Sequence, residues 1–277
     1  MSFLRRDASE KLTKKKRAGK PDLSVWILLA LGLTAALAGG LFRPEFWQDL
    51  QRRFYLDFIV DARYMWLVTG LRNTIIMTII ASVLGALLGL VLSLIRVAYK
   101  AGAPIKALDT LASLYITVMR GTPVMIQLMI IYFGIFVAAP ATMKLPIAGL
   151  AFGLNSAAYV AENFRAGIES IDIGQMEAGR SLGMTYGQSM RKIVLPQATR
   201  NVLPTLFNEL ITLLKETSVA GYIGLNDLTR SGQAIKDMTG DPMLPFLVVA
   251  LVYLVIVMGL TRVLRAIERR LSRSDRG

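Results

Sequence analysis

The chain has 277 residues, of which 54% are hydrophobic, and its mean hydropathy is +0.50. A soluble domain rarely carries so much apolar sequence, so the composition favours a protein that crosses a membrane several times. The net charge is +13, and the chain contains neither cysteine nor histidine. This excludes disulfides, thiol nucleophiles, Cys/His zinc sites and His-dependent triads. The chain also lacks a phosphate-binding P-loop sequence, so any ATP energy must be supplied by another chain.

The N-terminal region divides into a basic segment and an apolar one. Residues 1–23 hold eight Lys or Arg against three acids, which beside a membrane span indicates a cytoplasmic tail rather than a nucleic-acid-binding arm. Residues 24–42 are uncharged and long enough to span a bilayer at ~1.5 Å per residue. An alternative stays open: the small residues before Gly39 resemble a signal-peptidase site, so either residues 24–42 are a retained span or residues 1–38 are a removed leader.

The next segments predict a loop and a second span. Residues 43–69 mix both signs of charge with aromatic side chains, so we expect an external loop with segments lying on the membrane surface. Residues 73–95 are uncharged and contain Gly85 and Gly89, a spacing that permits close approach of another helix. The basic stretch 96–106 then indicates a cytoplasmic loop.

Four further spans complete the predicted topology. The span at 107–139 is interrupted by Arg120, Gly121, Thr122 and Pro123, where the proline removes a backbone bond and predicts a helix break. Spans at 145–170, 201–223 and 242–261 follow, and residues 266–277 form a basic tail. Six spans return both basic termini to the cytoplasm. The predicted fold is therefore an all-α, multi-pass membrane protein.

A polar stretch at residues 172–196 interrupts this apolar pattern. Asp172 is suited to cap a helix that begins at Ile173, and Gly183 is suited to a left-handed helix end. The helical pattern resumes after Gly183, and we expect it to stop at Pro196, which cannot donate to a helical ladder. The prediction is a compact, polar loop on an aqueous surface.

This stretch resembles the EAA loop of ABC-importer permeases, with one departure, Gly179 in place of alanine. The family spacing is matched by Glu177, Ala178, Gly179, Gly183, Ile193, Leu195 and Pro196. Residues 120–127, 154–170 and 208–224 also resemble the polar amino acid uptake branch, the histidine, glutamine and glutamate type of permease. The resemblance implies a five-span type-1 transmembrane domain at residues 70–265, preceded by one extra helix.

The resemblance also implies an assembly in the bacterial inner membrane. Its parts are two ATP-binding cassette subunits docked on the EAA loops, a second permease that is identical or homologous, and an extracytoplasmic solute-binding protein. ATP and Mg belong to the partner ATPase, so this chain needs no cofactor or metal and is itself no enzyme. The remaining partners are the lipid bilayer and an amino acid, with no nucleic acid.

Two polar faces are candidates for the substrate pathway. Asn155, Tyr159 and Glu162 follow i, i+4, i+7 on one helical face, and Asn208, Glu209 and Thr212 lie in a polar stripe on the next span. Polar groups facing lipid are costly, so both faces should meet other helices or a water-lined cavity. Alternatively, Glu162 with Arg165, and Lys215 with Glu216, are ion pairs that only hold the bundle. Gln127 is a weaker candidate, with packing as its alternative role.

The function predicted is the permease subunit of an ATP-driven importer of a polar or charged amino acid, working by alternating access. The alternative is a secondary transporter in which Glu162 or Glu209 relays protons or binds a coupling ion. The missing Cys and His disfavour an intramembrane enzyme.

Overall fold

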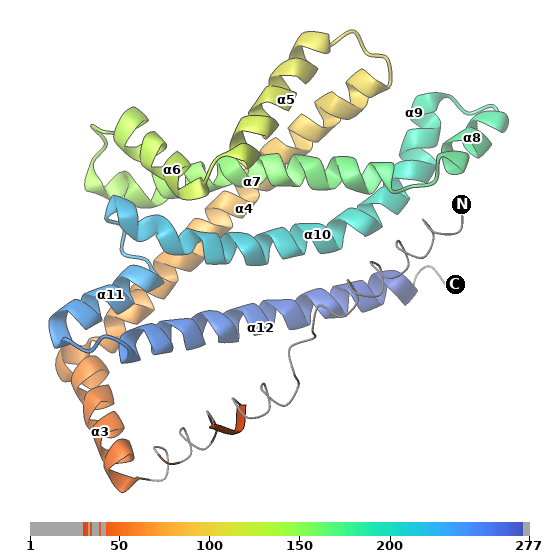
Figure 1. Cartoon of the computed structure of the whole chain (residues 1–277). Helices are drawn as coiled ribbons and strands as arrows, with labels where there is room; N and C mark the ends of the chain where they lie inside the picture. Colours follow the sequence, from red (N-terminus) through yellow and green to blue (C-terminus); the bar gives the residue numbers. More distant parts are fainter. Residues whose placement is uncertain (1–29, 33, 35–38, 40–42, 274–277) are drawn as a thin grey trace, which may run out of the picture. The chain divides into compact units, whose positions relative to one another are not determined.

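The computed structural model describes residues 30–32, 34, 39 and 43–273, and these are helical apart from short turns and loops (Figure 1). The chain divides into two units, Met1–Leu56 and Asp57–Gly277, and each is described by itself. The basic tail predicted at 1–23 lies outside the described residues. The span or leader predicted at 24–42 lies mostly outside them, as does the tip of the basic tail at 274–277.

The first unit contains α3 (Pro44–Phe54), which lies within the predicted loop 43–69. Pro44 starts the helix, where its missing N–H costs nothing. Glu45 lies in the first turn and Arg52 and Arg53 in the last, an order that complements the helix dipole. A π-helical turn at Tyr55–Ile59 and a 3₁₀ turn at Val60–Ala62 follow.

The longest helix of the second unit is α4 (Tyr64–Lys100). It begins at Tyr64 rather than near the predicted Asn73, so the domain start predicted at residue 70 falls inside a helix. The physical reason is that Arg72 interrupts the apolar run but not the backbone hydrogen bonding. Gly70 itself lies against α11 (Leu228–Thr239), where an added Cβ would come within 2.5 Å of the Asp227 carbonyl oxygen.

Small residues let α4 pack closely along α7 (Lys144–Glu169), as the spacing of Gly85 and Gly89 predicts. A Cβ added at Gly85 would lie 2.9 Å from the Cβ of Ser156, and one at Gly89 would lie 2.6 Å from that of Val160. The buried side chains of Met77, Leu128 and Phe152 come from α4, α6 and α7 and pack together in one apolar core.

The predicted break lies between α5 (Lys106–Gly121) and α6 (Val124–Met129). The helix axis bends by 109° there, and α6 continues as a π-helical turn over Ile130–Ile135. A 3₁₀ turn at Ala141–Met143 then leads into α7.

The loop at 172–196 connects α7 to α10 (Leu195–Glu216), and these two helices pack against each other. Within it are α8 (Ile173–Ser181), α9 (Tyr186–Ser189) and a π-helical turn at Met190–Val194. The prediction that Pro196 ends a helix is wrong. Pro196 follows directly on the π-helical turn at Met190–Val194 and lies in the first turn of α10, so the helical backbone continues through it.

The C-terminal part contains one helix that sequence reasoning missed. A 3₁₀ segment at Thr217–Ile223 is followed by α11, whose Asp227 cap and left-handed Gly240 are recognisable start and stop signals. α12 (Leu244–Arg273) follows. α12 includes residues 266–273, which the sequence assigned to a basic tail. The charged side chains there favour water over lipid, but they do not interrupt the helical hydrogen bonding of the backbone.

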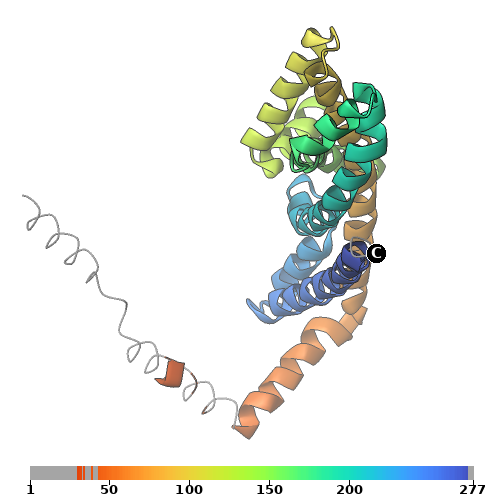
Figure 2. The same ribbon diagram turned by 90° about the vertical axis from the view of Figure 1, so that its right-hand side faces the viewer.

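Within the part of the chain that the structure describes, α4 and α12 are long and apolar enough to cross a membrane. The bent pair formed by α5 and residues 124–135 makes a third candidate if it counts as one span. The six-span count therefore stays a prediction. In the second unit, the end of α4, the 172–196 loop and the end of α12 lie toward the same end (Figures 1 and 2). These are the segments that the sequence analysis places on the same side of the membrane.

Candidate functional site

The segment that resembles the EAA loop, residues 172–196 and called the EAA loop below, is built by capping interactions within itself. The Asp172 carboxylate accepts from the Gly174 N–H at 2.8 Å and begins α8. α8 ends in a Schellman motif, in which the Met184 N–H donates to the Gly179 carbonyl and the Gly183 N–H to that of Arg180. Gly183 has φ +82°, the left-handed conformation that the sequence predicts for it.

A second cap starts the helix after this turn. Thr185 and Gln188 form a capping box. The Thr185 N–H donates to the side-chain oxygen of Gln188 at 2.8 Å, and the Gln188 N–H donates to the Thr185 hydroxyl oxygen at 3.3 Å. The departure at Gly179 also has a structural reason. A Cβ there would lie 2.6 Å from the Ser189 hydroxyl oxygen and 2.8 Å from Cδ1 of Ile193, so glycine allows α8 to pack closely on the rest of the loop.

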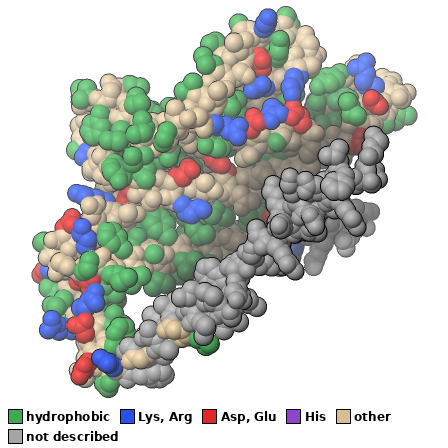
Figure 3. All heavy atoms as spheres, in the orientation of Figure 1, with side chains coloured by type: hydrophobic (Ala, Val, Ile, Leu, Met, Phe, Trp, Pro, Cys, Tyr) green, Lys and Arg blue, Asp and Glu red, His purple; other side chains and the backbone are tan. Residues whose placement is uncertain are grey.

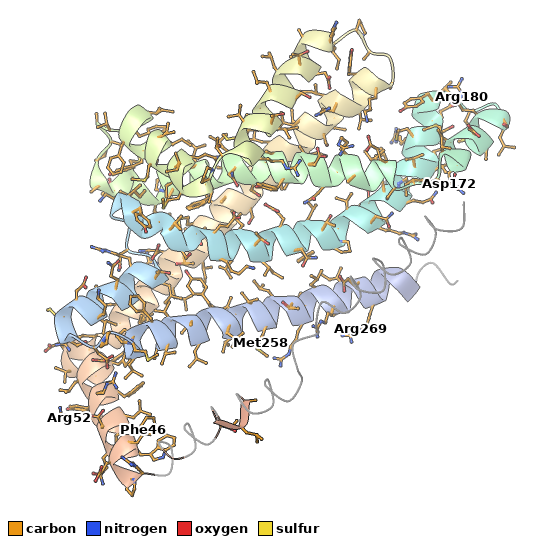
Figure 4. All side chains as sticks on the ribbon, in the orientation of Figure 1. Phe46, Arg52, Asp172, Arg180, Met258 and Arg269 are labelled. Carbon is orange, nitrogen blue, oxygen red and sulfur yellow. The ribbon has the colours of Figure 1, made fainter. Side chains whose placement is uncertain are left out.

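The loop presents an outward surface that the sequence predicted only in part. Glu177 and Ala178 are exposed, as expected for a docking surface. The large apolar side chains on the outside are Ile173 and Leu182, 73% and 83% exposed, which sequence reasoning missed. Tyr186 is half-buried and lines a cavity of about 350 Å³ between the loop and the ends of α4 and α7, and Ile173 lies at the edge of the same cavity. Figure 4 shows Asp172 where the loop leaves α7.

Ion pairs connect the base of the loop to three helices. Glu169, at the end of α7, pairs with Lys100 of α4 and with Arg165. Arg165 also pairs with Glu162, and Arg120 of α5 approaches the same carboxylate at 3.8 Å. Charged side chains of both signs gather in this region in Figure 3. Glu162 therefore takes part in the ion pairs that the sequence offered as its alternative role.

The buried amides of Asn155 and Gln127 hold the helix break. A helix end leaves carbonyls without partners, and here Gln127 donates to the Met119 and Thr122 carbonyls at 2.8 and 3.1 Å. Asn155 of α7 donates to Gln127 at 2.8 Å and to Met119 at 3.2 Å, and it is only 2% exposed. Both side chains thus have their hydrogen bonds within the protein.

The remaining pathway candidates lie on two other faces. Tyr159 packs beneath the Arg120 guanidinium, 5.5 Å from its ring centroid. Glu209 of α10 is partly buried and accepts from the Ser156 hydroxyl at 3.2 Å. Asn208 and Thr212 are exposed on α10. The structure therefore separates the predicted set into groups that hold the break, groups that pair with Arg120, and a polar stripe on α10.

At the opposite end of the second unit, Asp227 organises the turn before α11. Its carboxylate is fully buried and accepts from the backbone N–H groups of Gly221 and Arg230 at 2.9 and 2.6 Å. Burial raises the pKa of Asp227 to about 6, although those backbone donors oppose the shift. Asp227 is therefore a structural cap, and an acid before an apolar residue is the signal by which the sequence marks it.

Comparison with known proteins places this architecture in a class. The family of binding-protein-dependent transport system inner membrane components matches residues 95–273. A structure described as an amino acid ABC transporter with histidines superposes with a TM-score of 0.70 and 38% identity, covering 77% of this chain and 98% of that one. An inward-facing structure of the MetNI methionine ABC transporter has the same fold, with a TM-score of 0.63 at 24% identity, covering 75% and 97%.

The chain belongs to this family of inner membrane transport components. The arginine transport system permease protein ArtQ of Bacillus subtilis (strain 168) is 43% identical over 170 residues, which are 60% of this chain and 76% of that one. A putative glutamine transport system permease protein of Rickettsia conorii is 38% identical over 167 residues, 60% and 77% of the two chains. These relatives give no support to the alternative of a proton- or ion-coupled secondary transporter.

Proposed function

We propose that this chain is the permease subunit of an ATP-driven importer for a polar or charged amino acid. The observation that carries the proposal is the EAA loop, a rigidly capped element with exposed Glu177, Ile173 and Leu182 at the end of the α7–α10 hairpin. Family membership and the amino acid permeases among the relatives support the substrate class.

The loop's construction suits it to transmit force. Its turns are fixed by hydrogen bonds within the loop, and α7, from which the loop leaves, is tied at its end to α4 by the Lys100–Glu169 ion pair. A push on α8 is therefore passed to the helices rather than absorbed by a flexible loop. In the proposed assembly, two ATPase subunits bind ATP and Mg and dock on two such loops, one from this chain and one from a second permease.

The coupling role is tested by Gly183→Val. A β-branched residue at φ +82° costs on the order of 1–3 kcal/mol and distorts the turn. The matched control is Gly102→Val, because Gly102 also has positive φ and open space around it but lies in the α4–α5 connection. We expect hydrolysis stimulated by loaded binding protein to be lost in Gly183→Val alone, with insertion of both variants intact. Equal stimulation in both variants would show that this loop does not couple.

For the pathway, we propose the polar stripe of α10, with Asn208, Glu209 and Thr212, as the surface that meets the amino acid. Asn208 and Thr212 are exposed, whereas the amides of Asn155 and Gln127 already have partners. Glu209→Gln keeps the side-chain volume and the acceptor for Ser156. It should reduce uptake of a cationic amino acid severalfold without loss of assembly. Uptake unchanged for cationic, anionic and neutral amino acids would remove Glu209 from the pathway.

For orientation, we propose that the EAA loop and both termini face the cytoplasm and that residues 43–72 face outward. Because the chain has no native cysteine, single cysteines can be labelled in intact cells with an impermeant thiol reagent. Cysteines at exposed loop positions such as Ala178 should stay unlabelled until the cells are opened. Labelling of Ala178→Cys from outside would contradict this topology.

A further inference from the structure

α3 divides its side chains between an apolar face and a polar one. Phe46, Trp47, Leu50 and Phe54 fall within an arc of about 100° when placed on a helix of 3.6 residues per turn. The three aromatic members are 41%, 55% and 46% exposed in chain order, and α3 contributes no buried residue. Figure 4 shows Phe46 and Arg52 extending from different sides of the helix.

The rest of α3 is hydrophilic, and its charge is uneven along the axis. Glu45 lies in the first turn, whereas Arg52 and Arg53 lie in the last. Asp49 and Arg53 approach each other at 3.9 Å along the polar edge. The last turn is therefore basic, beside an apolar face made largely of aromatic rings. This combination suits a boundary at which hydrocarbon, phosphate groups and water lie within a few ångströms of one another.

The chain itself keeps α3 close to the membrane. The candidate span α4 begins at Tyr64, and only residues 55–63 separate it from the end of α3. Nine residues reach at most about 30 Å when fully extended. Aromatic residues flank this connection at Tyr55 and Tyr64, both exposed, and such residues concentrate at the headgroup level.

We propose that α3 is an interfacial helix that lies in the plane of the membrane surface at the start of α4. Its apolar face enters the boundary between headgroups and acyl chains, and Arg52 and Arg53 contact lipid phosphates. The occupant of the apolar face is the phospholipid bilayer. This inference goes beyond the transport function and does not depend on it, since it requires only that α4 crosses a membrane.

The test uses the full-length chain, which has no native cysteine, in nanodiscs of phosphatidylethanolamine and phosphatidylglycerol. Nitroxide labels are placed singly at Phe46→Cys and Leu50→Cys on the apolar face, and at Gln48→Cys and Gln51→Cys as matched positions on the polar face. Collision rates are measured with oxygen, which partitions into lipid, and with a neutral nickel chelate, which stays in water. We expect the oxygen-to-nickel ratio to be severalfold higher at 46 and 50 than at 48 and 51.

Two results would overturn the proposal. Similar ratios on both faces would mean that α3 stands in water, and low collision rates with both reagents at 46 and 50 would mean that protein covers the face. A second variant separates lipid from protein contact: Leu50→Glu, with the label at 46, should lower the ratio to the value at 48. A ratio at 46 that is unchanged by Leu50→Glu would show that something other than lipid insertion holds the face.

Discussion

The EAA loop and the α5–α6 break are both places where a helix ends beside a glycine, yet they satisfy their free backbone groups in different ways. In the loop, every cap comes from a residue at most five positions away, such as Asp172 to Gly174 or Thr185 to Gln188. At the break, the Met119 carbonyl receives its bonds from Gln127 and from Asn155, the latter 36 residues along the chain. The loop is therefore built locally, and the break is built by tertiary packing.

This difference decides what each region can do. A locally capped element keeps its shape while its surface is exposed, and Glu177 and Leu182 are exposed on the loop. The break keeps its shape only while Asn155 and Gln127 stay buried together. Substitutions at the break should therefore lower stability, and those on the outside of the loop should affect partner binding alone.

The largest effect on stability is expected for Asn155→Leu. The substitution keeps the branched side-chain shape but leaves the Gln127 amide oxygen and one bond of the Met119 carbonyl without a donor, which costs about 1–3 kcal/mol. The control is Asn208→Leu, because Asn208 is exposed on α10. Thermal denaturation of the purified protein in nanodiscs measures both. Equal midpoints for Asn155→Leu and the wild type would mean that the break does not depend on this amide.

A double-mutant cycle sharpens the same point. Gln127→Leu removes the donor to Met119 and Thr122 as well as the acceptor for Asn155. Because the two amides act as one network, Asn155→Leu should cost much less in the Gln127→Leu background than in the wild type. The cycle is read from the same denaturation midpoints. Strictly additive losses would show two independent bonds instead.

A smaller and local effect is expected for Asp172→Ala. Loss of this helix cap costs about 1 kcal/mol. The hydrogen bond described for the Asp172 carboxylate goes to Gly174 in the first turn of α8, so the local opening should be confined to that turn. Hydrogen exchange followed by mass spectrometry should show faster exchange at residues 173–176 with an unchanged global midpoint. Faster exchange spreading into α7 or α10 would contradict a locally built loop.

The smallest effect on stability is expected for Leu182→Ala. Leu182 is 83% exposed, so the free energy of unfolding should change by no more than about 0.5 kcal/mol. Copurification of the ATPase with the permease should nevertheless fall, and Leu182→Met, which keeps an apolar side chain of similar size, should restore it. Normal copurification with Leu182→Ala would place the docking contact elsewhere on the loop.

Several features of the molecule were determined by the sequence alone, because their causes are local. The Asp172 cap and the left-handed Gly183 depend on residues only a few positions apart. Pro123 also marked the position of the α5–α6 break, although Gln127 and Asn155 hold its shape. Gly85 and Gly89 likewise marked a close helix contact before its partner was known. The start of α4, in contrast, was predicted too far along the chain. Hydropathy indicates where a helix contacts lipid, whereas the backbone hydrogen bonding of a helix also continues through residues that do not contact lipid.

The tertiary structure alone decided which polar side chains have partners inside the protein. Asn155, Glu162 and Glu209 were equivalent candidates as sequence, since a period of 3.6 residues assigns a side chain to a face but not to a neighbour. Packing then buried Asn155 against Met119, brought Arg120 of α5 to Glu162, and set Glu209 beside Ser156. The same long-range packing turned Tyr186 toward the cavity and left Leu182 outside. Such outcomes depend on contacts between distant segments, which no local pattern encodes.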